Sequence, residues 1–377
     1  PTIREIVNTL LLRGSIGKEG AGVCPVRGHS NVQGDRTMGI YEKPKAAFLE
    51  RLGREFAFTP PAEHGFDTVA AIHAMAEGRA KFFFALGGNF SMATPDTAFT
   101  WQALRRCAVT AQVSTKLNRS HLVTGEEAYL LPCLARSDRD APGGKSRFVT
   151  VEDSMSLVHS SQGHLPAPSE HLLAEPEVVA RLARATLGAR STVPWEELGA
   201  DYDAIRDRIE RVIDGFEDFN RRVREPGGFR LPSGARERRF ETQSGKAAFT
   251  VLPLPDVAVG AGELRMMTIR SHDQFNTTIY GLEDRYRGIS GDRRVVLMNR
   301  DDMAERGLAE GAKVDLENTT AGRQRRARSF RVVGFDVPRG VVATYFPEAN
   351  VLVPVESFAE KSHTPAYKSV PVTIRPA

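Results

Sequence analysis

The spacing of hydrophobic residues predicts alternating helices and strands over the first two thirds of the chain. Apolar residues recur at three- and four-residue spacing over 3–11 and predict a helix, with Gly14 as its stop. A second predicted helix is capped by Asp67 and ends at Gly78. Residues 81–86 form an apolar run too short for a helix, which predicts a buried strand.

A strand–turn–helix–strand order follows from the next segments. Gly87 and Gly88 come directly after the strand, Pro95 opens a helix, and residues 108–113 give a second strand. This order predicts a βαβ unit with a parallel pair. Further along, residues 136–168 predict a loop excursion, 176–188 a helix, 203–223 one long amphipathic helix and 226–262 a linker.

Short strand-like runs dominate after about residue 263. They cover 265–269, 294–298, 313–316, 330–333, 341–345 and 370–374, with one short helix at 301–306. Such spacing suggests a closed barrel. The predicted fold class is therefore an α/β lobe with a parallel sheet, followed by a β-barrel. The predicted domains are 1–30, the end of an α/β domain with a cofactor loop; 31–262, an α/β domain; and 263–377, the barrel.

The amino-acid composition argues against several classes of function. Among 377 residues, 51 basic and 47 acidic side chains give a net charge of +4, which does not indicate nucleic-acid binding. No apolar stretch approaches the ~18–20 residues of a membrane helix, so no membrane partner is expected. The cysteines (Cys24, Cys107 and Cys133) are widely spaced, which excludes a disulfide framework and a cysteine-only metal site within this chain. A reducing, cytoplasmic location is expected.

The first residue is not Met, and a helix is predicted from the start of the chain. Two interpretations stay open: a trimmed or mature terminus, or the C-terminal part of a larger protein.

Three segments carry candidate chemistry. The turn at Gly87–Asn89 can cradle a phosphate or be a plain strand–helix turn. The basic run 323–328 can bind nucleic acid or lipid, and a solvated, protected sheet edge is the favoured interpretation. Arg27, in a glycine-rich loop, can grip a carboxylate or phosphate, or pair with Glu19 or Asp35. A polar cluster at 272–276 can hold a ligand, but a metal is not expected there because adjacent side chains of a strand point to opposite faces.

The loop 17–34 resembles a segment of molybdopterin-dependent oxidoreductases of the formate dehydrogenase alpha-subunit type, where a G-x-N-P-V-R-G-x-N-N-V-Q-G run approaches the molybdenum. Residues 86–89, 245–249, 268–277, 341–350 and 364–368 resemble further segments of that family in the same order. Two departures place the chain in a formate-dehydrogenase-like side group. Cys24 and His29 replace the usual Asn and Gln, and the segment 112–115 lacks the Asp common after that strand.

The resemblance implies a molybdenum bis(molybdopterin guanine dinucleotide) cofactor and a small anionic substrate. It implies that Arg27 steadies the substrate and that His29 shuttles a proton. The barrel would be of the double-psi, aspartate-decarboxylase-like type. Implied cofactor contacts come from Gln33, Gly87, Asn89, Ser114, Thr115, Arg270, His272, Asn276, Thr277, Asn350, Tyr367 and Lys368.

The resemblance also implies a 4Fe-4S cluster and the metal ligand in a missing N-terminal half of the same protein, which would be this chain's partner. The sequence leaves the substrate, the electron acceptor and the oligomeric state open. The alternative function is a non-catalytic cofactor-binding fragment. A nicotinamide-dependent dehydrogenase is a third candidate, but the chain lacks the G-x-G-x-x-G fingerprint.

Overall fold

In the computed structural model, which describes residues 2–25, 31–254, 258–275 and 279–377, the chain divides into two units. Unit 1 comprises residues 1–65 and 134–256, and unit 2 comprises residues 66–133 and 257–377. Each unit is thus built from two separate stretches of chain. The units group the chain differently from the sequence-based division at 30 and 262, and the domain boundaries themselves stay a prediction.

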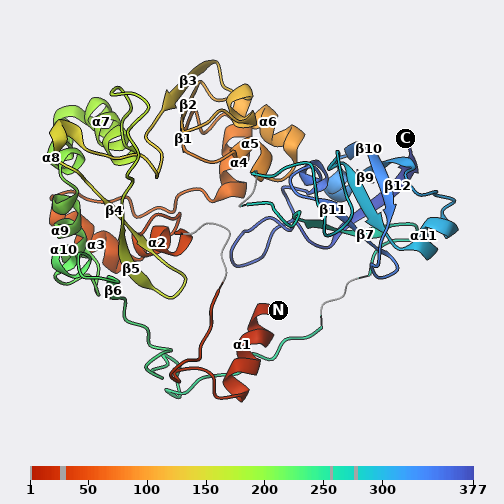
Figure 1. Ribbon diagram of the computed structural model, residues 1–377, viewed down its shortest axis with the longest axis horizontal. Coiled ribbons are helices and arrows are strands. Elements are labelled where there is room, and N and C mark those ends of the chain that lie inside the picture. Colours follow the sequence, from red (N-terminus) through yellow and green to blue (C-terminus); the bar gives the residue numbers. More distant parts are fainter. Residues whose placement is uncertain (1, 26–30, 255–257, 276–278) are drawn as a thin grey trace. The chain divides into compact units, whose positions relative to one another are not determined.

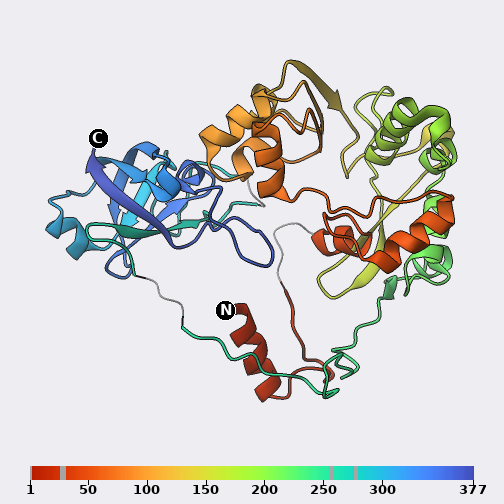
Figure 2. The same cartoon turned by 180° about the vertical axis from the view of Figure 1, so that it is seen from behind.

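The first stretch of unit 2 forms a three-stranded parallel sheet in the order β1 (Phe82–Leu86), β2 (Val109–Ser114) and β3 (Glu127–Pro132). Helices α4 (Thr68–Ala76), α5 (Phe90–Ala93) and α6 (Thr97–Arg105) lie to one side of it (Figures 1 and 2). Asp67 caps α4 by accepting a hydrogen bond from the Ala70 N–H at 2.9 Å. The predicted βαβ unit is confirmed, and β3 is a third strand that the sequence analysis did not predict. The prediction that β1 is buried is wrong, since Phe82 is 51% exposed.

The second stretch of unit 2 is a closed barrel, as predicted. Its strands are β7 (Leu264–Ile269), β8 (Val295–Met298), β9 (Lys313–Asn318), β10 (Arg325–Gly334), β11 (Val341–Tyr345) and β12 (Val370–Pro376), in the spatial order β10-β8-β11-β7-β12-β9. Helix α11 (Arg300–Glu305) follows β8, and 3-10 turns occur at Thr320–Gly322 and Asn350–Leu352. Alternating apolar residues such as Met266, Val314 and Val342 fill its core.

The prediction that the basic run 323–328 lies on a solvated strand is wrong at Arg325, which is buried. Over Arg325–Ala327 β10 pairs with β9, and its pairing with β8 covers Arg331–Gly334. The Arg325 side chain is 2% exposed and lies against the carboxylate of Asp96, just before α6. Arg325 contacts the buried Asp96 carboxylate and the partly exposed Glu356 carboxylate, whereas Arg328 is exposed.

Unit 1 is mostly helical. Its helices are α1 (Thr2–Leu12), α2 (Val32–Thr37), α3 (Ala46–Phe56), α7 (Glu175–Leu187), α8 (Trp195–Ala200), α9 (Tyr202–Val212) and α10 (Phe219–Arg222). The strands β4 (Val149–Glu152), β5 (Leu157–Ser161) and β6 (Phe229–Arg230) form an antiparallel sheet. A cluster around Phe216, Phe219 and Phe229 packs between helix and sheet.

Two predictions for unit 1 need correction. The loop excursion at 136–168 contains the β4–β5 hairpin, whose hydrophobic residues are too few to give a clear alternation. The single helix predicted over 203–223 is broken between α9 and α10. Gly215 has φ +92° and Asp218 has φ +55°, both left-handed, so the chain turns between the two helices. The predicted helices at the N-terminus and at 176–188 are confirmed.

Across the described parts of the chain, no helix is long and apolar enough to cross a membrane.

Candidate functional site

The glycine turn after β1 leaves its backbone accessible. Gly87 and Gly88 have φ of +66° and +76°, and a Cβ added to either would meet no atom within 4 Å. The backbone conformation therefore requires glycine, and the space above it is open to a ligand. The Gly87 N–H donates to the Val113 carbonyl at 2.7 Å, which ties the turn to the carboxyl end of β2.

Asn89 joins this turn to the 3-10 turn η1 (Arg119–Leu122). Its Oδ1 accepts a hydrogen bond from the Ser120 hydroxyl at 3.0 Å, and Asn118 Nδ2 donates to the Gly88 carbonyl at 2.9 Å. The turns after β1 and β2 are therefore one cross-linked rim. Asn89 holds its shape, and direct contact with a cofactor stays a prediction.

A pocket of about 260 Å³ lies beyond the carboxyl ends of β2 and β3. Ser114 and Thr115 line it, as expected for ligand contacts at this end of a parallel sheet. The other lining residues are Gln112, Lys116, Leu117, His121, Leu130, Leu131 and Pro132. Burial lowers the pKa of His121, and its Nδ1 accepts the Asn118 N–H at 3.0 Å, so the ring is neutral near pH 7.

The sequence analysis did not select Lys116 or His121. Both follow the β2 strand within eight residues, and the rule that ligands bind beyond the carboxyl ends of parallel strands would have selected them.

One end of the barrel brings together Arg270, Tyr367 and Lys368. The Lys368 ammonium donates to the Thr268 carbonyl, and its pKa is lowered by desolvation and by the positive charge of Arg270. The Tyr367 hydroxyl donates to the Ala93 carbonyl at 2.8 Å, and burial raises its pKa. Two positive charges close together at one end of the barrel suit an anionic ligand.

His272 lies in the loop that follows β7, with its side chain exposed and its ring 3.8 Å from that of Tyr286. Arg293, 3% exposed, holds this loop by donating to Ser271 Oγ at 2.7 Å and to Gln274 Oε1 at 2.9 Å. The guanidinium also lies between the rings of Tyr280 and Tyr345, at 3.8 and 4.6 Å from their centroids. Nothing in the local sequence marks Arg293 as a positioning residue, since its partners come from distant segments.

Asn350, for which the resemblance implies a cofactor contact, is fully buried. Its Nδ2 donates to the Met92 carbonyl at 2.7 Å and to the Thr94 carbonyl at 3.4 Å. It therefore fastens the barrel to the segment after α5. Cofactor contact by Asn350 stays a prediction.

The remaining predicted residues divide into two groups. Gln33 belongs to α2 in unit 1, and its side-chain amide donates to the Glu152 carbonyl of β4. The Glu152 N–H donates to Asn31 Oδ1 at 2.8 Å, so two side chains of this segment anchor it on β4. Arg27, His29, Asn276 and Thr277 lie outside the described residues.

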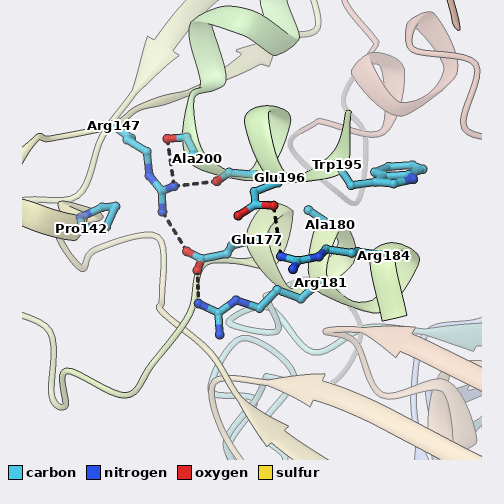
Figure 3. A pocket seen from close by; sticks show the side chains of 10 residues that line it. Pro142, Arg147, Glu177, Ala180, Arg181, Arg184, Trp195, Glu196 and Ala200 are labelled. Carbon is cyan, nitrogen blue, oxygen red and sulfur yellow. Dashed lines mark hydrogen bonds and ion pairs between the residues drawn. The ribbon is translucent and has the colours of Figure 1, made fainter. Parts of the chain in front are cut away.

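A larger pocket, of about 550 Å³, lies in unit 1 between α7 and α8 and contains none of the predicted site residues (Figure 3). Arg147 is held there by Asp140, Glu177 and the Gly199 carbonyl, while Arg184 pairs with Glu196. These charges compensate one another. Within the described ranges, no group of three or more His, Cys, Asp or Glu side chains could hold a metal ion.

Comparison with known proteins shows which proteins this chain is similar to. Residues 264–371, nearly the whole barrel, match the family described as molydopterin dinucleotide binding domain. Over its whole length the chain is 55% identical to an "Uncharacterized oxidoreductase" of Mycobacterium tuberculosis and 45% identical to Protein YdeP of Escherichia coli. It covers 49% and 50% of those two proteins, so it spans about half the length of the curated relatives it matches.

Two more distant proteins are also similar to this chain. The "Putative formate dehydrogenase YrhE" of Bacillus subtilis is 33% identical over 24% of this chain and 10% of its own length. The solved structure of acetylene hydratase from Pelobacter acetylenicus shares 15% identity with a TM-score of 0.55, covering 91% of this chain and 50% of that one, which shows a common fold alone. The resemblance to molybdopterin oxidoreductases drawn from the sequence is confirmed.

The residues of unit 2 fit a pterin dinucleotide. The open turn at Gly87 and Gly88 allows close approach of a phosphate to backbone, and the hydroxyls of Ser114 and Thr115 line a pocket beside it. At the barrel end, Arg270 and Lys368 supply positive charge for phosphate oxygens.

Proposed function

We propose that this chain is the part of a molybdenum-dependent, formate-dehydrogenase-like oxidoreductase that holds bis(molybdopterin guanine dinucleotide). The observation that carries the proposal is the barrel's match to a dinucleotide-binding family, together with the close pair of cations, Arg270 and Lys368, at one of its ends. When bound, the cofactor supplies the redox chemistry, with molybdenum exchanging electrons with the substrate.

The chain's own groups bind and orient. In the proposal, Arg270, His272 and Lys368 hold one phosphate-bearing arm of the cofactor. The backbone at Gly87 and the hydroxyls of Ser114 and Thr115 hold the other. Asn350 and Arg293 keep these surfaces in place through the contacts described above. The double-psi, aspartate-decarboxylase-like topology of the barrel belongs to the same proposal.

The substrate is proposed to be a small anion. Arg27, whose side-chain type is a permanently charged donor of paired hydrogen bonds, is assigned to steady it, and His29 is assigned to move a proton, because histidine side chains in general exchange protons near neutral pH. A 4Fe-4S cluster is proposed for the part of the longer relatives that this chain does not span, and the cytoplasm for the protein's location. The competing proposal is a cofactor-binding protein without turnover.

The proposal can be tested with a defined probe. Guanosine diphosphate should bind the purified chain in a calorimetric titration, and Arg270→Gln with Lys368→Gln should weaken that binding at least ~10-fold, which is about 1.4 kcal/mol. Arg328→Gln removes an exposed charge from the same barrel and should leave the affinity unchanged. No binding at millimolar nucleotide, or equal loss in both variants, would contradict the proposal.

A further inference from the structure

The parallel sheet of unit 2 is covered on one face only by its own helices. Phe83 of β1 packs in a cluster with Ile72 of α4 and Leu104 of α6. Because side chains alternate along a strand, Phe82 and Phe84 point to the opposite face. Their ring centroids are 6.2 Å apart in a stacked arrangement, as neighbours on one face should be.

The strand register extends this second face across all three strands. Phe84 lies opposite Ala111, which lies opposite Tyr129, and residues paired in a parallel sheet point to the same side. Except for Glu127 at one end of β3, the face is entirely apolar or aromatic. We call it the open face; its members are Phe82, Phe84, Leu86, Val109, Ala111, Val113, Tyr129 and Leu131.

The two outer strands leave this face exposed. Phe82 and Tyr129 are each 51% exposed, and Leu86 and Leu131 are 44% and 40% exposed. Parallel sheets occur almost only with both faces covered, and large apolar patches on a protein surface mark interaction sites. The open face is therefore apolar apart from Glu127 and is exposed along its two outer strands, whereas Ala111 and Val113 of the central strand are 8% and 0% exposed.

We propose that the open face is a docking surface for an apolar helical layer of the polypeptide that corresponds to the half of the longer relatives not spanned by this chain. Two observations select this partner. The relatives are similar along the whole of this chain yet contain about as much sequence again. The layer that covers a parallel sheet is usually helical, because crossovers between parallel strands are helices. The proposal concerns assembly and does not depend on which cofactor is bound.

Hydroxyl-radical footprinting tests this without a substitution. A chimera is made in which the chain replaces its counterpart in the Mycobacterium tuberculosis relative, and oxidation of single residues is measured in the chimera and in the chain alone. Phe82 and Tyr129 should react readily in the chain alone and be protected severalfold in the chimera. Leu122 is the control, because it is 80% exposed on η1, which packs against α5 on the other side of the sheet, and it should react equally in both.

Other occupants give different outcomes, and each overturns the proposal. Protection in the chain alone that grows with protein concentration would mean that a second copy covers the face. Protection independent of concentration would mean that unit 1 covers it. Equal reactivity in both proteins would mean that nothing docks there. If the chimera also oxidises Phe216 and Phe219, which are buried in the chain, it is misfolded, and the same footprint is read on the chain co-produced with the separate remaining half.

A substitution gives an independent measurement. Phe82→Asp should lower the unfolding midpoint of the chimera by roughly 5 °C or more beyond its effect on the chain alone, because a charge is buried only when the partner is present. Leu122→Asp should have the same effect in both proteins. A Phe82→Asp effect that is equal in both would overturn the proposal.

Discussion

Replacing Arg325 with Met tests whether the barrel and the sheet of unit 2 are joined by a buried charge network. The guanidinium and the Asp96 carboxylate are 2% and 3% exposed, and Arg325 Nε donates to Asp96 Oδ2 at 2.9 Å. Arg325 also donates to Glu356 at 2.8 Å and to the Thr320 carbonyl at 2.9 Å. Met fills a similar volume without charge, so the change isolates the electrostatic loss from a packing defect.

The expected loss of stability depends on which charges remain near Asp96 after the substitution. Removing one partner of a buried ion pair costs about 3–5 kcal/mol, because the other charge is left uncompensated. Arg323 also donates to Asp96 Oδ2, at 3.0 Å, and is 38% exposed, so part of the compensation survives. We therefore expect the lower end, about 3 kcal/mol, which for a unit of this size lowers the unfolding midpoint by roughly 6–12 °C.

Denaturant unfolding of a double-mutant cycle is the assay. Asp96→Asn combined with Arg325→Met should cost less than the sum of the single changes by at least ~1 kcal/mol, since neither charge is then left alone. Arg328→Met, which changes an exposed Arg on the same strand, is the control and should stay within about 0.5 kcal/mol. If Arg325→Met behaves like Arg328→Met, the guanidinium is solvated and the buried network is wrong.

Four further outcomes are expected. Arg27→Lys in the cofactor-loaded full-length protein should reduce turnover at least roughly tenfold, about 1.4 kcal/mol, with normal cofactor content; unchanged turnover would contradict substrate anchoring. Asn350→Ala should lower the free energy of unfolding by about 1–3 kcal/mol, measured with denaturant, because the buried Met92 carbonyl loses its hydrogen bond from the Asn350 side chain; an unchanged free energy would contradict this role of Asn350. The affinity for guanosine diphosphate should fall as pH rises through the lowered pKa of Lys368, below the ordinary 10.5, and Lys368→Arg should abolish that decline. Over the same pH interval the free energy of unfolding of the unliganded protein should rise with pH, because the unfolded state binds more protons than the folded state there. An affinity and a stability that do not change with pH would contradict these two expectations. Elemental analysis of the chain alone should find no stoichiometric molybdenum or iron, and about one metal per chain would refute this.

Elements whose pattern depends on local spacing could be predicted from the sequence. The barrel strands are short runs rich in β-forming residues between Gly, Pro and Asn turns, and every predicted strand from 265 to 374 is present in the structure. The capped helix after Asp67 and the helix that stops at Gly188 also follow local rules. Where a single residue redirects the chain, as Gly215 does between α9 and α10, the apolar stripe continues across the break and predicts one helix instead of two.

Positions decided by distant partners could not be predicted. The local sequence gives no reason to treat Arg325 and Arg328 differently. Arg325 is buried against Asp96, which lies about 230 residues earlier in the chain, whereas Arg328 is exposed. The family resemblance implied a cofactor contact for Asn350, whereas its partners in the structure are the carbonyls of Met92 and Thr94. The site residues beyond the sheet and at the barrel end were predictable from the carboxyl-end rule and the family resemblance. The positioning role of Arg293 was not predictable, because its partners come from separate segments that meet only in the folded chain.

The strand β1 shows why a disagreement between pattern and burial is informative. Its five residues, Phe-Phe-Phe-Ala-Leu, have no polar position on either face, which is typical of a parallel strand covered on both sides. In the structure the Phe83 face is covered by α4 and α6, whereas Phe82 and Leu86 are 51% and 44% exposed on the other. The sequence pattern indicates what environment each face requires, and the structure shows which environment this chain supplies by itself. The difference between them at β1 locates the surface that another polypeptide should cover, and Tyr129 and Leu131 of β3 are exposed on the same face.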